Sequence, residues 1–161
     1  MKNILLALFI CAITPKFAFA ATPVVISKPT SGNPQDIKFF SDLESFNCSK
    51  TDSGTSCIGE IKPENKVAWG AGFCRDTKEQ LTESINKGSV VLTINGQEII
   101  PSQIQINYQS YKRPHSAHCQ TWLVNLSNWV PGTTTRLTAI VTYHDRPKYS
   151  ESIIATVLHD Q

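Results

Sequence analysis

A short polar segment between two predicted strands carries the side chains best suited to binding a partner. This segment, from Tyr108 to His118, reads YQSYKRPHSAH. Tyrosine and arginine supply much contact energy per residue, and connections on a rigid scaffold often carry recognition. The alternative is a solvated loop whose tyrosines pack inward. We predict that the ligand-binding residues are Tyr108, Tyr111, Lys112, Arg113 and His115.

The same segment contains the pattern H-x-x-H-C, formed by His115, His118 and Cys119. A zinc site needs three or four ligands in tetrahedral geometry, and Cys119 is better explained as half of a disulfide. His144 and His159 lie far away in the sequence. We therefore predict no metal site and no cofactor.

Catalytic motifs are absent from the sequence. It contains no G-x-S-x-G, H-E-x-x-H, C-x-x-C or phosphate-binding glycine loop. His144 and Asp145 could form a hydrolytic site with a serine, but adjacent residues of a strand point to opposite sides. We predict no catalytic residues and keep a small secreted hydrolase or metal-dependent effector as an alternative.

The first 20 residues have the pattern of a cleaved signal peptide. Lys2 provides the positive charge, an apolar run extends from Ile4 to Ile13, and Ala18-Phe19-Ala20 forms a small-x-small cleavage site. The run is too short for a transmembrane anchor. We expect a single domain from residue 21 to 161, secreted to the periplasm or the extracellular space.

Four cysteines remain after the predicted cleavage, which indicates two disulfides in an oxidising compartment. Four cysteines allow three pairings. Cys48 and Cys57 flank the turn-rich sequence SKTDSGTS, which would bring two strand ends together. We predict the pairs Cys48–Cys57 and Cys74–Cys119.

The charge balance excludes partners that need concentrated positive charge. Removing Lys2 and Lys16 from the 15 basic residues leaves 13, against 13 acidic residues. A near-neutral chain with scattered lysine and arginine is not expected to bind nucleic acid or an anionic membrane. We expect a monomer whose partner is an extracellular protein or glycan.

Alternating apolar residues and turn signals predict many short strands. Asn95-Gly96 is the strongest hairpin turn signal, and Pro131-Gly132 predicts a type II turn. The predicted strands lie near residues 24–26, 37–40, 43–48, 56–62, 67–74, 89–94, 97–100, 104–111, 122–126, 134–143 and 152–158. Gly70 and Gly72 predict a bulge or a close backbone approach within one of them.

One helix is predicted after Cys74. Asp76 is a suitable N-cap, Glu79 completes a capping box, and Gly88 follows as the C-cap. Leu81 and Ile85 lie four residues apart on one face. We expect about three turns lying across an open end of a sandwich.

The stretch from Cys119 to Tyr143 resembles a known family. A tryptophan, then Pro-Gly-Thr, then the strand pattern Leu-x-Ala-x-Val-x-Tyr is similar to bacterial immunoglobulin-like and fibronectin-III-like domains. The resemblance implies an all-β, disulfide-stapled antiparallel sandwich that binds, spaces or presents something outside the cell. It also implies a central tryptophan near an inter-sheet disulfide, and Trp122 is the candidate.

Two further interpretations remain open. Trp69, Phe73, Trp122 and Trp129 could form a platform for sugar rings, although core packing is the stronger explanation because each lies in an apolar run. The chain could also be a structural module of an extracellular assembly. In either case no sequence motif identifies the ligand.

Overall fold

The computed structural model describes residues 24–29, 38–40, 43–111 and 117–159, so the predicted signal peptide lies outside the described residues. The described elements are β1 (Val25–Ser27), β2 (Lys38–Phe39), β3 (Phe46–Thr51), β4 (Gly54–Ile61), β5 (Val67–Arg75), α1 (Lys78–Lys87), β6 (Ser89–Ile94), β7 (Gln97–Glu98), a 3-10 turn η3 (Pro101–Gln103), β8 (Gln105–Tyr111), β9 (Ala117–Ser127), β10 (Thr134–Thr142) and β11 (Tyr149–Val157). No helix of this described part is long and apolar enough to cross a membrane.

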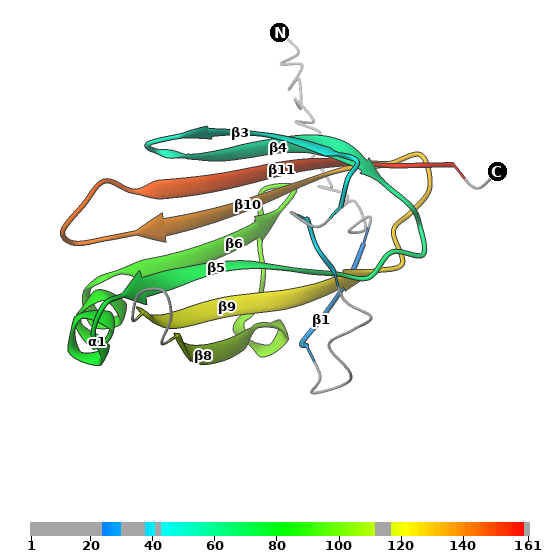
Figure 1. Cartoon of the computed structure of the whole chain (residues 1–161). Helices are drawn as coiled ribbons and strands as arrows, with labels where there is room; N and C mark the ends of the chain where they lie inside the picture. The colour runs from blue at the N-terminus through cyan, green and yellow to red at the C-terminus, as the bar shows by residue number, and fades with distance from the viewer. Residues whose placement is uncertain (1–23, 30–37, 41–42, 112–116, 160–161) are drawn as a thin grey trace, which may run out of the picture.

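The strands form two packed sheets, so the predicted all-β sandwich with one short helix is confirmed (Figure 1). The first sheet has the order β1-β9-β5-β2, and β8 also pairs with β9. The second has the order β3-β4-β11-β10-β6-β7. Most pairs are antiparallel, but β2 pairs with β5 and β4 with β11 in parallel.

Both predicted disulfides are present and confirm the pairing Cys48–Cys57 and Cys74–Cys119. The first joins β3 to β4, and the second joins β5 to β9. The second bridge therefore lies within one sheet, rather than between the sheets as the family resemblance implied. It also lies on the outer face of that sheet, since its cysteines have the opposite parity to the buried Trp69 and Val124.

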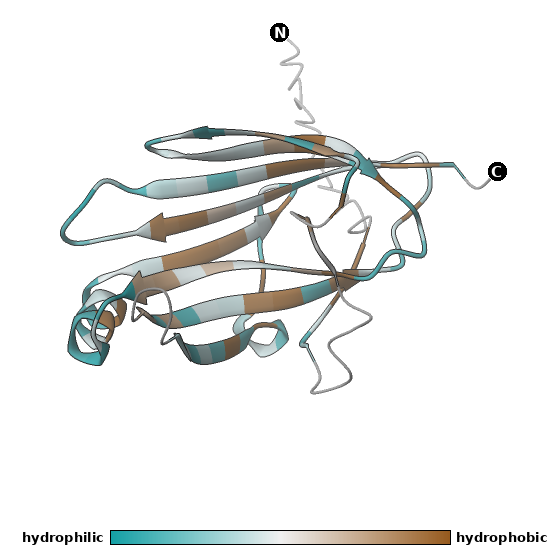
Figure 2. Cartoon of the chain, viewed as in Figure 1, coloured by the Kyte–Doolittle hydropathy of each residue, from teal (hydrophilic) through white to brown (hydrophobic). Residues whose placement is uncertain are grey.

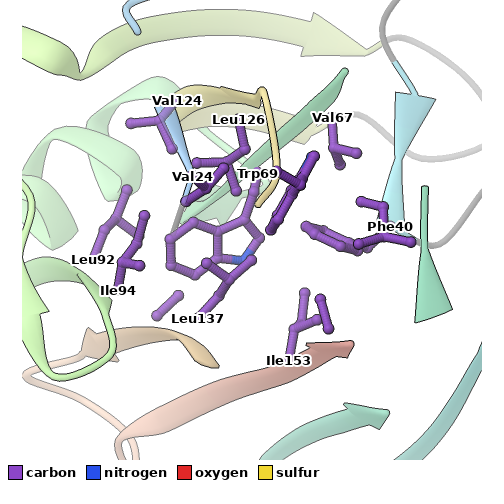
Figure 3. Close-up of a cluster of buried hydrophobic side chains, with 14 of the residues drawn as sticks. Val24, Phe40, Val67, Trp69, Leu92, Ile94, Val124, Leu126, Leu137 and Ile153 are labelled. Atoms are coloured by element: carbon purple, nitrogen blue, oxygen red, sulfur yellow. The ribbon is translucent and has the colours of Figure 1, made fainter. Parts of the chain in front are cut away.

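The core between the sheets is built around Trp69 and Trp129, each 2% exposed. Figure 3 shows Trp69 among aliphatic side chains from both sheets, such as Val124 and Leu137. The indole of Trp129 donates a hydrogen bond to the backbone oxygen of Asn65 at 3.0 Å. Trp122 is only partly buried, so the prediction that it is the central tryptophan is wrong.

The predicted turns are also confirmed. Asn95 and Gly96 adopt φ values of 50° and 81° between β6 and β7, as a type I′ hairpin requires. Gly132 has a φ of 72°, and the amide of Thr133 donates to the oxygen of Val130 at 3.3 Å. This turn carries the chain from β9 in the first sheet to β10 in the second.

Close backbone approach explains two glycines in β5. The pairing of β5 with β9 runs without interruption from Val67 to Arg75, so β5 contains no bulge. A Cβ atom on Gly70 would lie 1.8 Å from the backbone oxygen of Trp122, and one on Gly72 would lie 2.0 Å from that of Gln120. Of the two predicted alternatives, the close approach is the correct one.

Helix α1 lies at one end of the sandwich (Figure 1), as predicted. Its buried Leu81 packs with Phe73 of β5 and Val141 of β10 in a second, smaller core cluster. The N-cap is Thr77, whose hydroxyl accepts a hydrogen bond from the amide of Gln80 at 3.2 Å. The prediction of Asp76 as N-cap is wrong by one residue, because both side chains suit the position and the sequence does not fix where the helix begins.

The cap gives a direct test of this helix start. We expect Thr77→Ala to lower the free energy of unfolding by about 1 kcal/mol, the usual contribution of a capping hydroxyl. Asp76→Ala is the matched control and should cost less, because it removes no capping bond. Urea unfolding of both variants measures the difference, and an equal or larger loss for Asp76→Ala would contradict the observed cap.

Candidate functional site

The described part of the predicted recognition segment, residues 108–111 and 117–118, is strand rather than loop. β8 continues to Tyr111 and β9 begins at Ala117, so Tyr108, Tyr111 and His118 all belong to strands. The predicted strand over residues 104–111 is confirmed and contains both tyrosines, so the binding loop expected from Tyr108 to His118 is wrong at both of its ends. Lys112, Arg113 and His115 lie outside the described residues.

The two tyrosines lie on opposite faces of β8, because they are three residues apart in an extended strand. Tyr108 is 50% exposed and Tyr111 is 48% exposed. Tyr108 Oη and His118 Nδ1 share a hydrogen bond of 2.6 Å, and the two rings are stacked. Tyr111 donates a hydrogen bond to the side chain of Gln109. The structure therefore gives two separate aromatic surfaces, one on each face of the strand.

The inward face of β8 is exposed to solvent, which the alternating pattern did not predict. Ile106 and Tyr108 have the same parity as Ile104 and therefore belong to the face that was expected to be half-buried. Instead Ile106 is 57% exposed, and only Ile104 packs against the core. The second sheet does not cover this strand, and β8 forms the outer margin of the first sheet (Figure 1).

β8 is an edge strand without charge. Among the described elements it pairs only with β9. Its sequence, QINYQSY, contains neither a charged residue nor a proline, and its pairing with β9 is continuous. Edge strands are normally protected by charge, proline or bulges. The edge strands β2, β3 and β7 each contain a charged residue, namely Lys38, Lys50 and Glu98. β1 is also an uncharged edge strand, but it has only three residues, and its Ile26 carbonyl accepts a hydrogen bond from Gln103.

The hydropathy of the residues of β8 is consistent with an edge strand that exposes both polar and apolar side chains. Figure 2 shows β8 in alternating hydrophilic and hydrophobic bands along the outer margin of the first sheet. The strand is therefore neither a core strand nor a plain solvated edge. Exposed tyrosine and isoleucine beside asparagine and glutamine are typical of surfaces that bind other proteins or sugars.

A second candidate lies at the end of the sandwich that carries α1. A cavity of about 360 Å³ is lined there by Arg75, Asp76, Gln80, Glu83, Ser84, His144, Asp145 and Arg146. Arg75 Nη2 and Asp145 Oδ1 lie 3.0 Å apart. The guanidinium groups of Arg75 and Arg146 lie 5.2 and 4.3 Å from the ring centre of Tyr143. The positive and negative side chains of this cavity are largely engaged with one another or with Tyr143.

His144 and Asp145, the residues of the hydrolytic site considered from the sequence, both line this cavity, as does Ser84. His144 Nε2 lies 3.6 Å from Glu83 Oε1, whereas Asp145 binds Arg75. Ser84 is 1% exposed, and its hydroxyl makes no hydrogen bond. Nucleophilic catalysis needs a serine bonded to its base, and these three residues supply no such contact. The cavity thus gives the hydrolase alternative no specific support.

Metal binding finds no support in the described part of the chain. No group of three or more histidine, cysteine, aspartate and glutamate side chains there is placed to hold a metal ion. Cys119 is bonded to Cys74, and His118 bonds Tyr108. His115, the remaining member of the H-x-x-H-C pattern, lies outside the described residues.

One ionisable group that sequence reasoning missed is partly buried on the inward face of the second sheet. Glu151 of β11 has the inward parity of Ile153 and Ala155, and it accepts a hydrogen bond from Trp69 Nε1 at 3.3 Å. Burial raises the pKa of this carboxyl above its ordinary value of 4.5, and the Trp69 bond partly opposes the rise. The sequence analysis begins this strand at residue 152 and leaves Glu151 in the preceding loop, whereas β11 begins at Tyr149. Extending the alternation of Ile153 and Ala155 back by two residues would have placed Glu151 on the apolar face.

This placement predicts a pH-dependent gain in stability for Glu151→Gln. A carboxyl whose pKa is raised by folding favours the folded state below its ordinary pKa, and that contribution is lost as the pH rises through the folded value. The variant should therefore be more stable than the original protein at about pH 7 and similar to it below about pH 4. Unfolding at both pH values measures this. Glu60→Gln, an exposed change on β4, is the control, and a gain independent of pH would contradict the prediction.

Comparison with family models and with curated proteins finds no match for this chain, so its function has to be argued from its own residues and geometry.

Proposed function

We propose that this chain is an exported, non-catalytic binding protein that recognises an extracellular protein or glycan. The observation that carries the proposal is β8, an uncharged edge strand that exposes Ile106, Tyr108 and Tyr111. Exposed tyrosines combine a large contact area with few rotatable bonds, and they are common at recognition surfaces. Two disulfides hold the scaffold behind them.

Export is part of the same proposal. Two disulfides indicate an oxidising compartment, because cytosolic thiols are kept reduced. Residues 1–20 have the pattern of a signal peptide, and the proposal takes them to be removed. The binding strand would then face the periplasm or the extracellular space.

The test is binding of the exported, oxidised protein to a panel of cell surfaces and immobilised glycans. The variant Tyr108→Ala/Tyr111→Ala should bind at least about tenfold more weakly than the original protein, because truncating a central interface tyrosine commonly costs more than 1 kcal/mol. Circular dichroism confirms that the variant is folded. Ile58→Ala is the matched control, since Ile58 is 58% exposed on the second sheet.

Two outcomes would argue against this proposal. If neither the original protein nor the control binds any member of the panel, recognition of a cell-surface protein or glycan is not supported. If Ile58→Ala loses binding and the tyrosine variant keeps it, the recognition surface lies on the second sheet and not on β8.

A further inference from the structure

The backbone groups on the free edge of β8 can be assigned from the geometry of the neighbouring strands. In antiparallel sheets, paired residues that exchange hydrogen bonds have Cα atoms about 5.5 Å apart, and the alternate pairs about 4.5 Å apart. The Cα atoms of Cys74 and Cys119 are 4.1 Å apart, so this pair exchanges no backbone hydrogen bonds. The amide and carbonyl of Cys119 therefore point away from β5 and toward β8.

The alternation then fixes which backbone groups of β8 point away from β9 and from the other described strands. Cys119 pairs with Gln109, so Gln109 directs its backbone groups at β9. The residues on either side of Gln109 direct their backbone groups away from β9, and the two directions alternate along the whole strand. The groups on the open edge consequently belong to Ile106, Tyr108 and Ser110.

An independent contact supports this assignment. β1 pairs with β9 on the same side as β8, and Ile26 lies opposite Leu126. By the alternation along β9, the carbonyl of Ile26 points away from β9. It accepts a hydrogen bond from Gln103 Nε2 at 3.4 Å, as an outward carbonyl should.

The free groups of β8 are self-complementary. Tyr108 is the middle residue of the strand, with Ile106 two positions before it and Ser110 two positions after it. A two-fold axis at Tyr108 would place the outward groups of Ile106 opposite those of Ser110 in a second copy, and Tyr108 opposite itself. All three pairs would then exchange two hydrogen bonds each in an antiparallel ladder.

We propose that a second copy of this chain binds the open edge of β8 with its own β8, antiparallel and symmetric about Tyr108. The first sheets of the two copies would form one continuous sheet. Strand addition of this kind takes most of its affinity from backbone hydrogen bonds. The proposal differs from the monomer expected from the sequence, in which β8 could not be recognised as an edge strand because that depends on the sheet order.

The absence of charge makes β8 better suited to pairing with a second copy of itself than the charged edge strands of the molecule. In a symmetric pair a charged residue on the two-fold axis opposes its own copy, and directly opposed like charges destabilise a sheet. β8 contains no charge, so its self-pairing brings no like charges together, with asparagine opposite glutamine on the outer face. β3 contains Lys50 and is less suited to self-pairing.

Dimerisation is a property beyond the proposed binding function, and the two are compatible because they use different groups of β8. Strand addition uses the backbone edge, while the side chains of Tyr108 and Tyr111 still project from the two faces of the sheet. The dimer would place two copies of the aromatic surface side by side. Two linked sites bind a multivalent surface more tightly than one.

The first test is analytical ultracentrifugation of the exported, oxidised protein over a range of concentrations. The original protein should shift from the mass of one chain to that of two. Tyr108→Lys and Tyr108→Glu should each remain monomeric, because like charges would oppose each other at the axis. An equal mixture of these two variants should recover the mass of two chains, since opposite charges would then pair.

A second variant tests the backbone and not the side chain. Ser110→Pro removes an amide that points to the open edge, which the pairing with β9 does not use. This variant should stay folded by circular dichroism and remain monomeric, whereas Ser110→Ala should dimerise like the original protein. The comparison of Ser110→Pro with Ser110→Ala still tests the dimer if the charged Tyr108 variants fail to fold.

Two results would overturn the dimer. One is an original protein that keeps the mass of one chain at every concentration. The other is a folded Ser110→Pro variant that dimerises as strongly as Ser110→Ala. Binding to the surface and glycan panel is measured separately with dilute protein, so the proposed recognition role can stand or fall independently of the dimer.

Discussion

A variant in which Cys74 and Cys119 are both changed to alanine is expected to lose about 4 kcal/mol of unfolding free energy. The bridge closes a loop of 45 residues, so its loss releases much chain entropy in the unfolded state. The Cys48–Cys57 bridge closes a separation of only 9 residues, and its removal should cost about 3 kcal/mol. The free energy of unfolding of a native domain is about 5–15 kcal/mol, so the loss of either disulfide would remove a large share of the total stability.

Urea unfolding of the two double-alanine variants beside the oxidised protein measures this difference. The shorter bridge joins two strands that are already a hairpin, whereas the longer one joins β5 to β9 across a connection that contains α1, β6 and β8. A larger loss from removing Cys48–Cys57 would show that strain or residual structure outweighs loop entropy in this chain.

Trp69→Ala is expected to lower the free energy of unfolding by about 3–5 kcal/mol, the usual cost of truncating a fully buried aromatic side chain. Trp69 is 2% exposed in the main core, and its indole nitrogen bonds Glu151. Its truncation would leave a cavity and remove the hydrogen bond to the partly buried carboxyl of Glu151.

Trp122→Ala is the matched comparison, because Trp122 lies on the neighbouring strand β9 with the same inward parity. It is only partly buried and packs edge-to-face against Phe73. Its truncation should therefore cost clearly less than that of Trp69. If the two variants lost the same free energy of unfolding, the result would contradict the central position of Trp69 in the core shown in Figure 3.

Local signals in the sequence were sufficient for much of the fold. The Asn95-Gly96 hairpin, the Pro131-Gly132 turn, the two disulfides and the helix were all predicted, because each depends on residues close in sequence or on a count that leaves few choices. The N-cap differed by one residue, since Asp76 and Thr77 are both good capping residues.

The errors concern properties that depend on distant strands. The family resemblance makes Trp122 the central tryptophan, but Trp122 only packs against the margin of the core while Trp69 and Trp129 are fully buried. Only the sheet arrangement decides which tryptophan the second sheet covers. The sequence groups Tyr108 and Tyr111 in one recognition segment, whereas the structure places them on opposite faces of β8. Nothing in the local sequence shows that β8 is an edge strand, because this follows from the sheet order, in which β9 is its one partner among the described strands.

The measurement that tests the open edge most directly is residue-level amide hydrogen exchange along β8 in dilute and concentrated protein. The amides of Asn107 and Gln109 point to β9 and should exchange slowly at both concentrations. The amides of Ile106, Tyr108 and Ser110 should exchange fast in dilute protein and become protected when it is concentrated. Slow exchange of these three amides in dilute protein would contradict the account, because another part of the same chain would then already occupy the edge.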